Sequence, residues 1–375
     1  MRTFYLLDDP GRDKHFHAYI LAGLREAGFD PLVIYFRGDP RSLLHQQGFP
    51  TVSLGLGQKT YKRFNPWPVL KLASLIRSFN PRVIHVQRHR PLVYTGLALK
   101  LLRRKTPLLY TIRLSRLVRT PVRRLAFNLV KDRIRYVIAV SRGAAEDFLR
   151  RTGFPAERLL VIPNGIDPSP YQLDLPPKEA RRMFSLPEGF LFGMVARFRK
   201  AKDHPGLIRA FARALPDMPR AFLVLAGDGP KESSIRQMVA ELGLEKHVRF
   251  LGRVPPEKVP FLLRALDVFV HPTFREGMPA AVLEAMAAGL PVIATDAEGI
   301  TDLFETSRQF GQMLPCGDTE ALAHALRRFY ALSPEELKRM GTEARKRLEE
   351  GFTRDQMVAR NVDLYRRVLH ESQNP

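Results

Sequence analysis

Cysteine is nearly missing from the sequence: Cys316 is the single thiol in a chain of 375 residues. One thiol excludes an intramolecular disulfide and fits a reducing compartment. No run of 18 or more apolar residues occurs, so we expect no transmembrane helix. The apolar run of the first residues ends at Asp8 and Asp9, too short for a signal peptide core. These absences predict a cytoplasmic protein, soluble or bound to a membrane surface.

Acidic residues are absent between Asp39 and Asp132, a span that carries 19 Lys and Arg. Residues 1–165 hold 30 basic against 10 acidic residues, whereas the remainder holds 30 against 28. A plain basic surface explains scattered lysines, but not 92 consecutive residues without a carboxylate. Such a field attracts a polyanion, which is anionic lipid, nucleic acid or a phosphorylated acceptor.

Strand-like runs alternate with helical patterns along the chain, which predicts an α/β fold with parallel, doubly wound sheets. Turn residues at 163–177, with Asn164-Gly165 and five prolines, separate two such series. The last segment, 354–370, has apolar residues at helical spacing. The strands are expected at 3–7, 32–36, 83–86, 108–112, 136–140 and 159–162, and then at 190–195, 221–226, 248–251, 268–271 and 291–295.

Polar residues that follow the second series of strands suggest a ligand site, because ligands bind beyond the carboxyl ends of parallel strands. Arg197 and Lys202 follow the strand at 190–195, and two cations there could hold a pyrophosphate. The alternative is that they only keep the loop soluble.

Two glutamates, Glu276 and Glu284, stand on either side of an expected helix start near Pro279. The free N–H groups of that helix start favour a phosphate or an oxygen-rich ligand, and Gly277 lets the backbone approach it. Carboxylates accept hydrogen bonds from sugar hydroxyls, so the glutamates with the two cations describe a nucleotide-sugar site. The alternative is that both glutamates merely stabilise the helix dipole.

The stretch FREGMPAAVLEAMAAGLPVIATD (274–296) resembles the E-x7-E signature of retaining glycosyltransferases of family 4. YVIAVSRGAAEDFLRRTGFPAERLLVIPNGIDPSPY (136–171) and GMVARFRKAKDHPGLIRAFARAL (193–215) resemble the same family. The resemblance implies the GT-B fold, in which two facing Rossmann-like domains enclose a cleft. It implies an N-terminal acceptor-side domain (1–168), a C-terminal nucleotide-sugar domain (169–353) and a C-terminal helix (354–375) that crosses back onto the first domain.

The resemblance also implies site residues in this chain. Arg197 and Lys202 would bind the donor pyrophosphate, Glu276 the donor sugar and Glu284 the ribose. The family needs no metal cofactor, which agrees with the lack of a His/Cys/Asp ligand cluster in the sequence. Backbone groups complete the implied donor site, facing the sugar at Gly277, Met278, Pro279 and Ala280, and the phosphate at Gly299, Ile300 and Thr301.

The first half departs from the family pattern. Gly11 matches the first of two adjacent family glycines, but Arg12 stands at the place of the second. Gln87 and Arg113 stand where the family often carries histidine. His85 lies in an apolar run, as core histidines do, so His89 in the following loop is the candidate catalytic residue on the acceptor side.

We therefore expect a hexosyltransferase that moves a sugar from a UDP- or GDP-sugar, with retention, to a lipid-linked or anionic glycan acceptor. The specific reaction that we expect is the addition of a sugar to the lipopolysaccharide core. A sugar-phosphate synthase or phosphorylase of the same fold is an alternative. A nucleic-acid-binding protein is an alternative of a different class, but helix-turn-helix, zinc-finger and RNP-like motifs are missing, so we expect no nucleic-acid partner.

Residues 113–135 mix Arg and Lys with apolar side chains, and the part after Pro121 predicts a helix with a cationic face beside an apolar one. Such a helix lies in a membrane interface. The alternative is that its apolar side chains face the domain core. The first interpretation predicts a peripheral protein at the inner face of the cytoplasmic membrane, whose anionic lipids would be held by Arg116, Arg119, Arg123 and Arg124.

Overall fold

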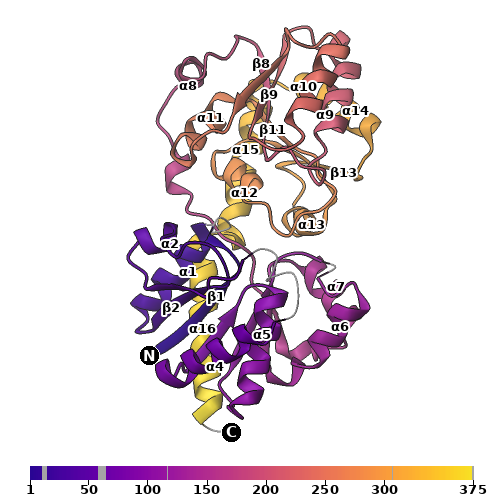
Figure 1. Cartoon of the computed structure of the whole chain (residues 1–375). Coiled ribbons are helices and arrows are strands. Elements are labelled where there is room, and N and C mark those ends of the chain that lie inside the picture. Colours follow the sequence, from indigo (N-terminus) through magenta and orange to yellow (C-terminus); the bar gives the residue numbers. More distant parts are fainter. Residues whose placement is uncertain (11–14, 58–64, 116, 306, 374–375) are drawn as a thin grey trace. The chain divides into compact units, whose positions relative to one another are not determined.

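The computed structural model describes the chain except for residues 11–14, 58–64, 116, 306 and 374–375. The chain divides into two compact units (Figure 1). Unit 1 comprises residues 1–164 and 354–375, and unit 2 comprises residues 165–353. Each unit is built around one sheet, and every pairing of the described strands is parallel. The predicted α/β class with two Rossmann-like units is confirmed.

Unit 1 contains a seven-stranded sheet within the described residues, in the order β3-β2-β1-β4-β5-β6-β7. All six strands expected from the sequence are present, with small differences at their ends, and the short edge strand β3 was not expected. The strands are β1 (Arg2–Leu7), β2 (Asp30–Tyr35), β3 (Thr51–Ser53), β4 (Val83–Val86), β5 (Leu108–Ile112), β6 (Ile134–Ala139) and β7 (Leu159–Val161).

Helices cover both faces of the unit 1 sheet. Alternate residues of each strand point to opposite faces, and apolar side chains on both faces need a covering layer. On β1, Phe4 and Leu6 pack into one core, whereas Tyr5 and Leu7 pack into another. Burial on both faces explains why these strands read as continuous apolar runs. The helices are α1 (His15–Glu26), α2 (Leu43–Gln46), α4 (Trp67–Phe79), α5 (His89–Leu101), α6 (Pro121–Asn128), α7 (Arg142–Thr152) and α16 (Arg354–Gln373).

The C-terminal helix α16 packs within unit 1, beside α1 (Figure 1). The two helices approach closely at Gly23, where an added Cβ would lie 2.1 Å from Cγ1 of Val358. Tyr365 is fully buried, meets Phe29 edge-on and hydrogen-bonds through its hydroxyl to Nδ1 of His85 at 3.0 Å. These contacts give the apolar residues of 354–370 the packing partner that the pattern demanded.

Unit 2 contains a six-stranded sheet within the described residues, in the order β10-β9-β8-β11-β12-β13. The strands are β8 (Phe190–Val195), β9 (Ala221–Ala226), β10 (Val248–Gly252), β11 (Val268–His271), β12 (Val292–Thr295) and β13 (Gly311–Leu314), of which β13 was not expected. The helices are α8 (Pro177–Met183), α9 (His204–Ala214), α10 (Glu232–Glu241), α11 (Val259–Ala265), α12 (Ala280–Ala287), α13 (Glu298–Phe304), α14 (Thr319–Tyr330) and α15 (Pro334–Gly351).

The strand order reverses at one place in each sheet. In unit 1 the chain moves outward through β2 and β3 and returns to place β4 beside β1. In unit 2 it moves outward through β9 and β10 and returns to place β11 beside β8. Loops on the carboxyl side of such neighbouring strands diverge and leave a crevice for ligands. The fold therefore marks the loops after β8 and β11, and those after β1 and β4, as candidate sites.

The packing of α16 leads to a stability prediction. Replacing Tyr365 by Ala should lower the free energy of unfolding of unit 1 by about 3–5 kcal/mol, because it opens a cavity and leaves His85 without its hydroxyl partner. The single tryptophan, Trp67, lies in unit 1, so denaturant unfolding followed by its fluorescence reports on that unit. Arg366→Ala on the exposed side of the same helix is the control and should change stability by at most about 0.5 kcal/mol. Equal stabilities for the two variants would contradict the packing role.

Candidate active site

Two loops at the carboxyl edge of the unit 2 sheet are tied together by backbone contacts. One loop joins β8 to α9 and the other joins β11 to α12. The amide of Phe274 donates to the carbonyl of Ala201 at 2.9 Å, and that of Asp203 donates to the carbonyl of Pro272 at 3.1 Å. The hydroxyl of Thr273 also donates to the carbonyl of Ala201 at 2.8 Å. This backbone framework fixes the side chains that project from both loops.

Lys202, Glu276 and His271 meet at this junction. The Lys202 ammonium forms an ion pair with the carboxylate of Glu276 and lies 2.9 Å from Nε2 of His271. His271, the last residue of β11, is almost fully buried, whereas the side chains of Lys202 and Glu276 remain 18% and 21% exposed. The buried His271 ring therefore holds the Lys202 ammonium in place, while the Lys202 side chain remains accessible to solvent.

Burial, followed by the charge of Lys202, lowers the pKa of His271 to about 4, although the contact with Glu276 acts in the opposite direction. The imidazole is thus neutral at pH 7 and accepts a hydrogen bond from the Lys202 ammonium. Burial alone would raise the pKa of Glu276, but the contacts with His271 and Lys202 bring it down to about 2. The Glu276 carboxylate is accordingly ionised at physiological pH and lies beside the Lys202 ammonium.

Arg197 follows β8 in the same loop as Lys202 but makes a different contact. Its guanidinium pairs with Asp228, which follows β9, at 3.3 Å, and both side chains are about half exposed. The turn around Asp228 needs glycines, since a Cβ on Gly227 would lie 2.1 Å from the carbonyl oxygen of Ala196. Among the described contacts, the two cations expected to clamp one pyrophosphate therefore hold separate partners, so their shared role stays a prediction.

The start of α12 fits the sequence prediction. Pro279 is the N-cap residue, the helix begins at Ala280, and no side chain caps it. Uncapped first-turn N–H groups favour an anionic or oxygen-rich ligand. Glu284 lies in the second turn of α12 and is half-buried. The structure thus supplies the helix start that the donor site would need, with Gly277 and Met278 in the loop before it.

The first turn of α13, which follows β12, packs against the loop before α12 through two glycines, Gly299 and Gly277. A Cβ on Gly299 would lie 1.5 Å from the carbonyl oxygen of Gly277, so no larger residue fits without movement. The Gly299 amide donates to the carbonyl of Glu276 at 3.2 Å, and those of Ile300 and Thr301 donate to the carbonyl of Ala297. These amides are engaged within the protein, and the phosphate-binding role assigned to residues 299–301 remains untested by this arrangement.

On the acceptor side, the two histidines of unit 1 differ. His85 is a satisfied core residue, bonded to Tyr365 through Nδ1 and to the Thr111 hydroxyl through Nε2 at 2.7 Å. His89 is the first residue of α5, and its buried Nδ1 has no hydrogen-bond partner. Burial, followed by the charges of Arg123 and Arg90, lowers the pKa of His89 to about 4. Gly11, the remaining expected contact, lies outside the described residues.

The comparisons with known proteins establish the family. Residues 178–347 match the sequence model described as glycosyl transferases group 1, and residues 17–170 match that described as glycosyltransferase family 4. The chain belongs to these glycosyltransferases.

Two relatives illustrate the sequence similarity. This glycosyltransferase is 33% identical over 181 residues to N-acetyl-alpha-D-glucosaminyl L-malate synthase of Bacillus anthracis, covering 48% of this chain and 46% of the relative. It is 31% identical over 226 residues to the putative colanic acid biosynthesis glycosyltransferase WcaL of Escherichia coli, covering 57% and 52%. The matched stretch thus spans about half the length of these relatives.

A solved structure confirms the fold over nearly the whole chain. The Anabaena protein Alr3699/HepE, in complex with UDP, superposes with a TM-score of 0.84 at 22% identity. The match covers 97% of this glycosyltransferase and 99% of that chain. The expected GT-B fold, with its two Rossmann-like units, is therefore confirmed.

His271 was not identified as a site residue from the sequence. It lies in an apolar strand, as His85 does, and the strand pattern does not distinguish a core histidine from one that contacts a lysine. Only the pairing of the loops after β8 and β11, which lie 69 residues apart at Lys202 and His271, brings its ring to the ammonium. A tertiary contact of this kind leaves no local signal.

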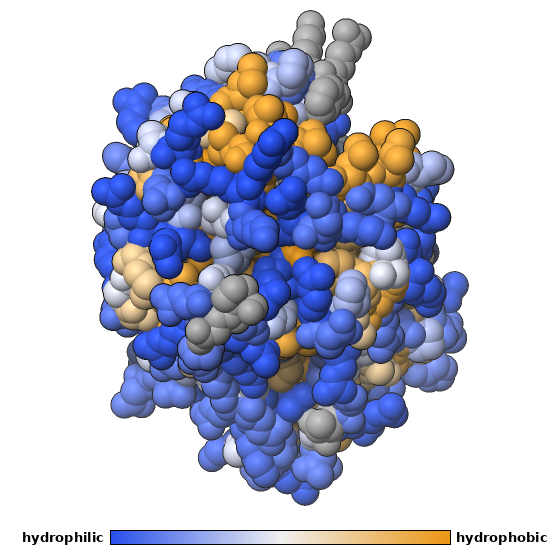
Figure 2. Space-filling model, turned by 90° about the horizontal axis from the view of Figure 1, so that it is seen from below, coloured by the Kyte–Doolittle hydropathy of each residue, from blue (hydrophilic) through white to orange (hydrophobic). Residues whose placement is uncertain are grey.

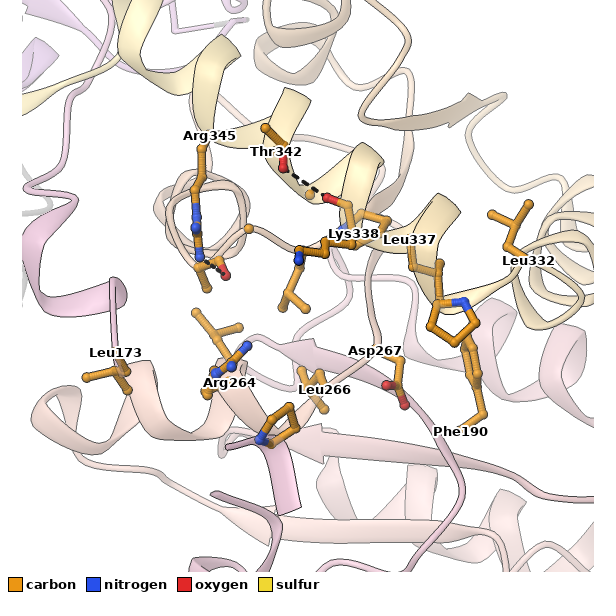
Figure 3. A pocket seen from close by; sticks show the side chains of 18 residues that line it. Leu173, Phe190, Arg264, Leu266, Asp267, Leu332, Leu337, Lys338, Thr342 and Arg345 are labelled. Atoms are coloured by element: carbon orange, nitrogen blue, oxygen red, sulfur yellow. Dashed lines mark hydrogen bonds between the residues drawn. The ribbon is translucent and has the colours of Figure 1, made fainter. Parts of the chain in front are cut away.

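A cavity of about 670 Å³ in unit 2 lies away from this site (Figure 3). It is lined by Phe190, Asp267 and Pro291, which lie at the amino ends of strands, and Lys338 and Arg345 reach into it from α15. None of the expected donor-site residues line it. The candidate active site therefore lies at the carboxyl edge of the sheet, where Lys202 and Glu276 meet, and not in this cavity.

The depressed pKa of His271 leads to a pH prediction. The unfolded chain protonates this histidine near its ordinary pKa of 6.5, whereas the folded protein resists protonation until about pH 4. Stability is therefore lost as the pH falls between these values, with a slope of up to about 1.4 kcal/mol per pH unit from this residue. Thermal unfolding of His271→Gln between pH 7 and 4 should show a shallower decline than the wild type. The exposed His324→Gln is the control, and an unchanged slope in His271→Gln would contradict the assignment.

Proposed function

We propose that this glycosyltransferase moves a hexose, with retention, from a nucleotide sugar to a hydroxyl group of a cell-envelope glycan or lipid-linked acceptor. The observation that carries the proposal is the Lys202–Glu276–His271 cluster beside the uncapped start of α12, at the point where the strand order of unit 2 reverses. UDP in the HepE structure and colanic acid in the name of WcaL support a UDP-sugar donor and an envelope polysaccharide product. Lipopolysaccharide core is one acceptor of this class.

In the proposed reaction, unit 2 binds the donor. The Lys202 ammonium interacts with the diphosphate as negative charge develops on it, and Arg197 leaves Asp228 to join it. Glu276 accepts hydrogen bonds from the sugar, and Glu284 accepts them from the ribose. Neutral His271 holds the ammonium in place without adding a competing charge. Donors fixed before the reaction in this way stabilise a developing anion most effectively.

The acceptor hydroxyl is proposed to attack from the face that the diphosphate leaves. The departing diphosphate oxygen then accepts the hydroxyl proton, so no enzyme nucleophile takes part. His89, neutral at pH 7 because of its lowered pKa, is the proposed polar contact on the acceptor side. Because cationic side chains and helix N–H groups would neutralise the diphosphate, we propose that the reaction proceeds without a metal cofactor and in the presence of EDTA.

Substitutions in the cluster test the donor site. Lys202→Ala should lower kcat/KM for transfer by about 10²-fold or more, because one fixed charge contact at the developing anion is lost. Glu284→Gln should weaken UDP binding while leaving thermal stability nearly unchanged. Glu276→Gln should depress transfer more than it weakens binding of the bare nucleotide. Transfer from a panel of UDP- and GDP-sugars, in buffer with EDTA, and calorimetry with UDP and GDP supply the measurements.

Lys200→Ala is the matched control, since it removes an exposed lysine from the same loop and should change neither measurement. Near-normal kcat/KM in Lys202→Ala would remove the main support for the proposed role of the cluster. Unchanged nucleotide affinity in Glu284→Gln would assign that glutamate to the helix dipole instead.

Helix α6 of unit 1 presents apolar side chains to solvent. Val122, Leu125 and Leu129 are 77%, 64% and 52% exposed, at spacings of three and four residues. Such spacing places them on one side of the helix. Phe127, in contrast, is fully buried against the unit 1 core. The apolar side chains of this segment therefore do not all face the core: Phe127 does, whereas Val122, Leu125 and Leu129 face solvent.

The exposed apolar side chains of α6 lie among cations. Arg119, Arg123 and Arg124 are exposed in the same segment, whereas Arg116 lies outside the described residues. Figure 2 shows one face of the molecule, on which hydrophobic patches are separated by hydrophilic surface. None of the helices in the described ranges is both long and apolar enough to cross a membrane. We propose that α6 docks on an anionic membrane surface at the cytoplasmic face, where lipid-linked acceptors are held.

Vesicle binding tests this docking. The protein should sediment with anionic vesicles at low salt and leave them at high salt, since the attraction is screened. Joint replacement of Arg119, Arg123 and Arg124 by Gln should weaken binding by roughly 1 kcal/mol per cation. Val122→Ser with Leu125→Ser should weaken it without changing the charge. As a control, the exposed unit 2 cations Arg209, Arg253 and Lys258 are replaced together by Gln. Wild-type protein that stays in the supernatant with anionic vesicles at low salt would refute the proposal.

A further inference from the structure

We propose that Arg113 is the anchor of an oxyanion-binding subsite at the carboxyl edge of the unit 1 sheet, and that it selects an acceptor bearing a phosphate or carboxylate group near its reactive hydroxyl. The inference rests on the proposed function for the identity of the ligand as an acceptor. The site itself is argued from unit 1 alone.

Arg113 directly follows β5, and Gln87 directly follows the neighbouring strand β4. One terminal nitrogen of the guanidinium donates to Oδ1 of Asn164 at 2.9 Å, and the other donates to Oε1 of Gln87 at 2.8 Å. Phe16 covers one face of the group, with its ring centroid 4.1 Å from the central carbon. The guanidinium is thus held in one orientation at the edge where ligands of parallel sheets bind.

The charge of Arg113 is not neutralised within the described part of unit 1. Both hydrogen-bond partners are neutral amides, no described carboxylate forms an ion pair with the guanidinium, and its Nε is buried without a hydrogen-bond partner. Asp8, which directly follows β1, pairs with Arg37. A half-buried cation without a counter-charge loses part of its hydration without compensation, and an anionic ligand would supply that compensation.

The surroundings of the guanidinium are consistent with an unpaired charge. Burial is the main cause that lowers the pKa of Arg113 to about 10, with the Tyr5 hydroxyl opposing the shift and the charge of Arg88 adding to it. Arg88 is also the N-cap residue of α5, whose start has no side-chain cap. Two cations and an uncapped helix start thus meet at the ends of β4 and β5. This combination favours a ligand with two or three acceptor oxygens, as in phosphate or carboxylate.

The matching ligand chemistry is an oxyanion attached to a sugar or another polyol. A planar guanidinium carries five N–H donors, and each terminal nitrogen of Arg113 has a second N–H beyond the one that its amide partner accepts. Such a group can bind an oxyanion in a bidentate way. A neutral acceptor would leave the cation unpaired, so it should bind more weakly. The basic surface of unit 1 attracts any anion at long range, and the proposed subsite in addition distinguishes an anionic acceptor from a neutral one.

Calorimetry on the full-length protein tests this subsite. The titrants are glucose 6-phosphate, glucuronate and glucose, which distinguish a phosphate, a carboxylate and no anion on one scaffold. Lys202→Ala is the background for all titrations, because it removes the proposed diphosphate contact of unit 2. Against this background, the phosphate or the carboxylate should bind more tightly than glucose, and Arg113→Gln should weaken that binding about tenfold or more while leaving glucose unchanged.

Two further variants make the outcome decisive. Arg82→Gln removes an exposed cation at the amino end of β4 and should leave all three affinities unchanged. Asn164→Asp places a carboxylate beside the guanidinium with almost no change in shape, and should weaken anion binding by competition even if Arg113→Gln does not fold. Equal anion affinity in wild type and in folded Asn164→Asp or Arg113→Gln would overturn the proposal. An equal loss of anion affinity in Arg82→Gln would also overturn the proposal, because it would show that the overall positive charge of unit 1, and not Arg113, attracts the anions.

The test separates this inference from the proposed function. UDP binding to the wild type reports on the donor site in unit 2, whereas the anion titrations report on unit 1. If UDP fails to bind but Arg113-dependent anion binding is found, the proposed function fails and the subsite stands. If UDP binds and the anions do not, the subsite fails and the transferase proposal stands.

Discussion

The parallel direction of the strands is the constraint on which the rest of the structure depends. Because every described pairing is parallel, all strands of a sheet end at one edge, and residues that follow different strands meet there. Lys202 follows β8 and Glu276 follows β11, yet they form an ion pair. Gln87 and Arg113 follow β4 and β5 and share a hydrogen bond. Each candidate site is thus a consequence of strand direction and strand order.

The two sites use charge in different ways. In unit 2, the Lys202 ammonium already has a carboxylate partner, so its charge is compensated before any donor binds. In unit 1, the Arg113 guanidinium is held by neutral amides among the described residues. A compensated cation suits a group whose charge develops during a reaction, whereas an uncompensated one suits a ligand that arrives already charged.

Most of the architecture could be predicted from the sequence, because strands buried on both faces read as continuous apolar runs. The expected strand at 83–86 and that at 268–271 match β4 and β11. The edge strands β3 and β13 escaped prediction, since Thr51–Ser53 and Gly311–Leu314 are short and only partly apolar. Their strand conformation comes from hydrogen bonds to a neighbouring strand, which a local pattern does not contain.

The sequence by itself determined the α/β class, the helix start after Pro279 and the candidate role of Lys202, Glu276 and Glu284, because these depend on local periodicity and on a contiguous motif. Only the tertiary structure decided that His271 supports Lys202, that Arg197 pairs with Asp228, and that Arg113 is half-buried beside neutral partners. The same holds for α6, where Phe127 turns inward and Val122 outward. The physical reason is that burial and ion pairing depend on which strand ends become neighbours, and residues far apart in the chain supply those neighbours.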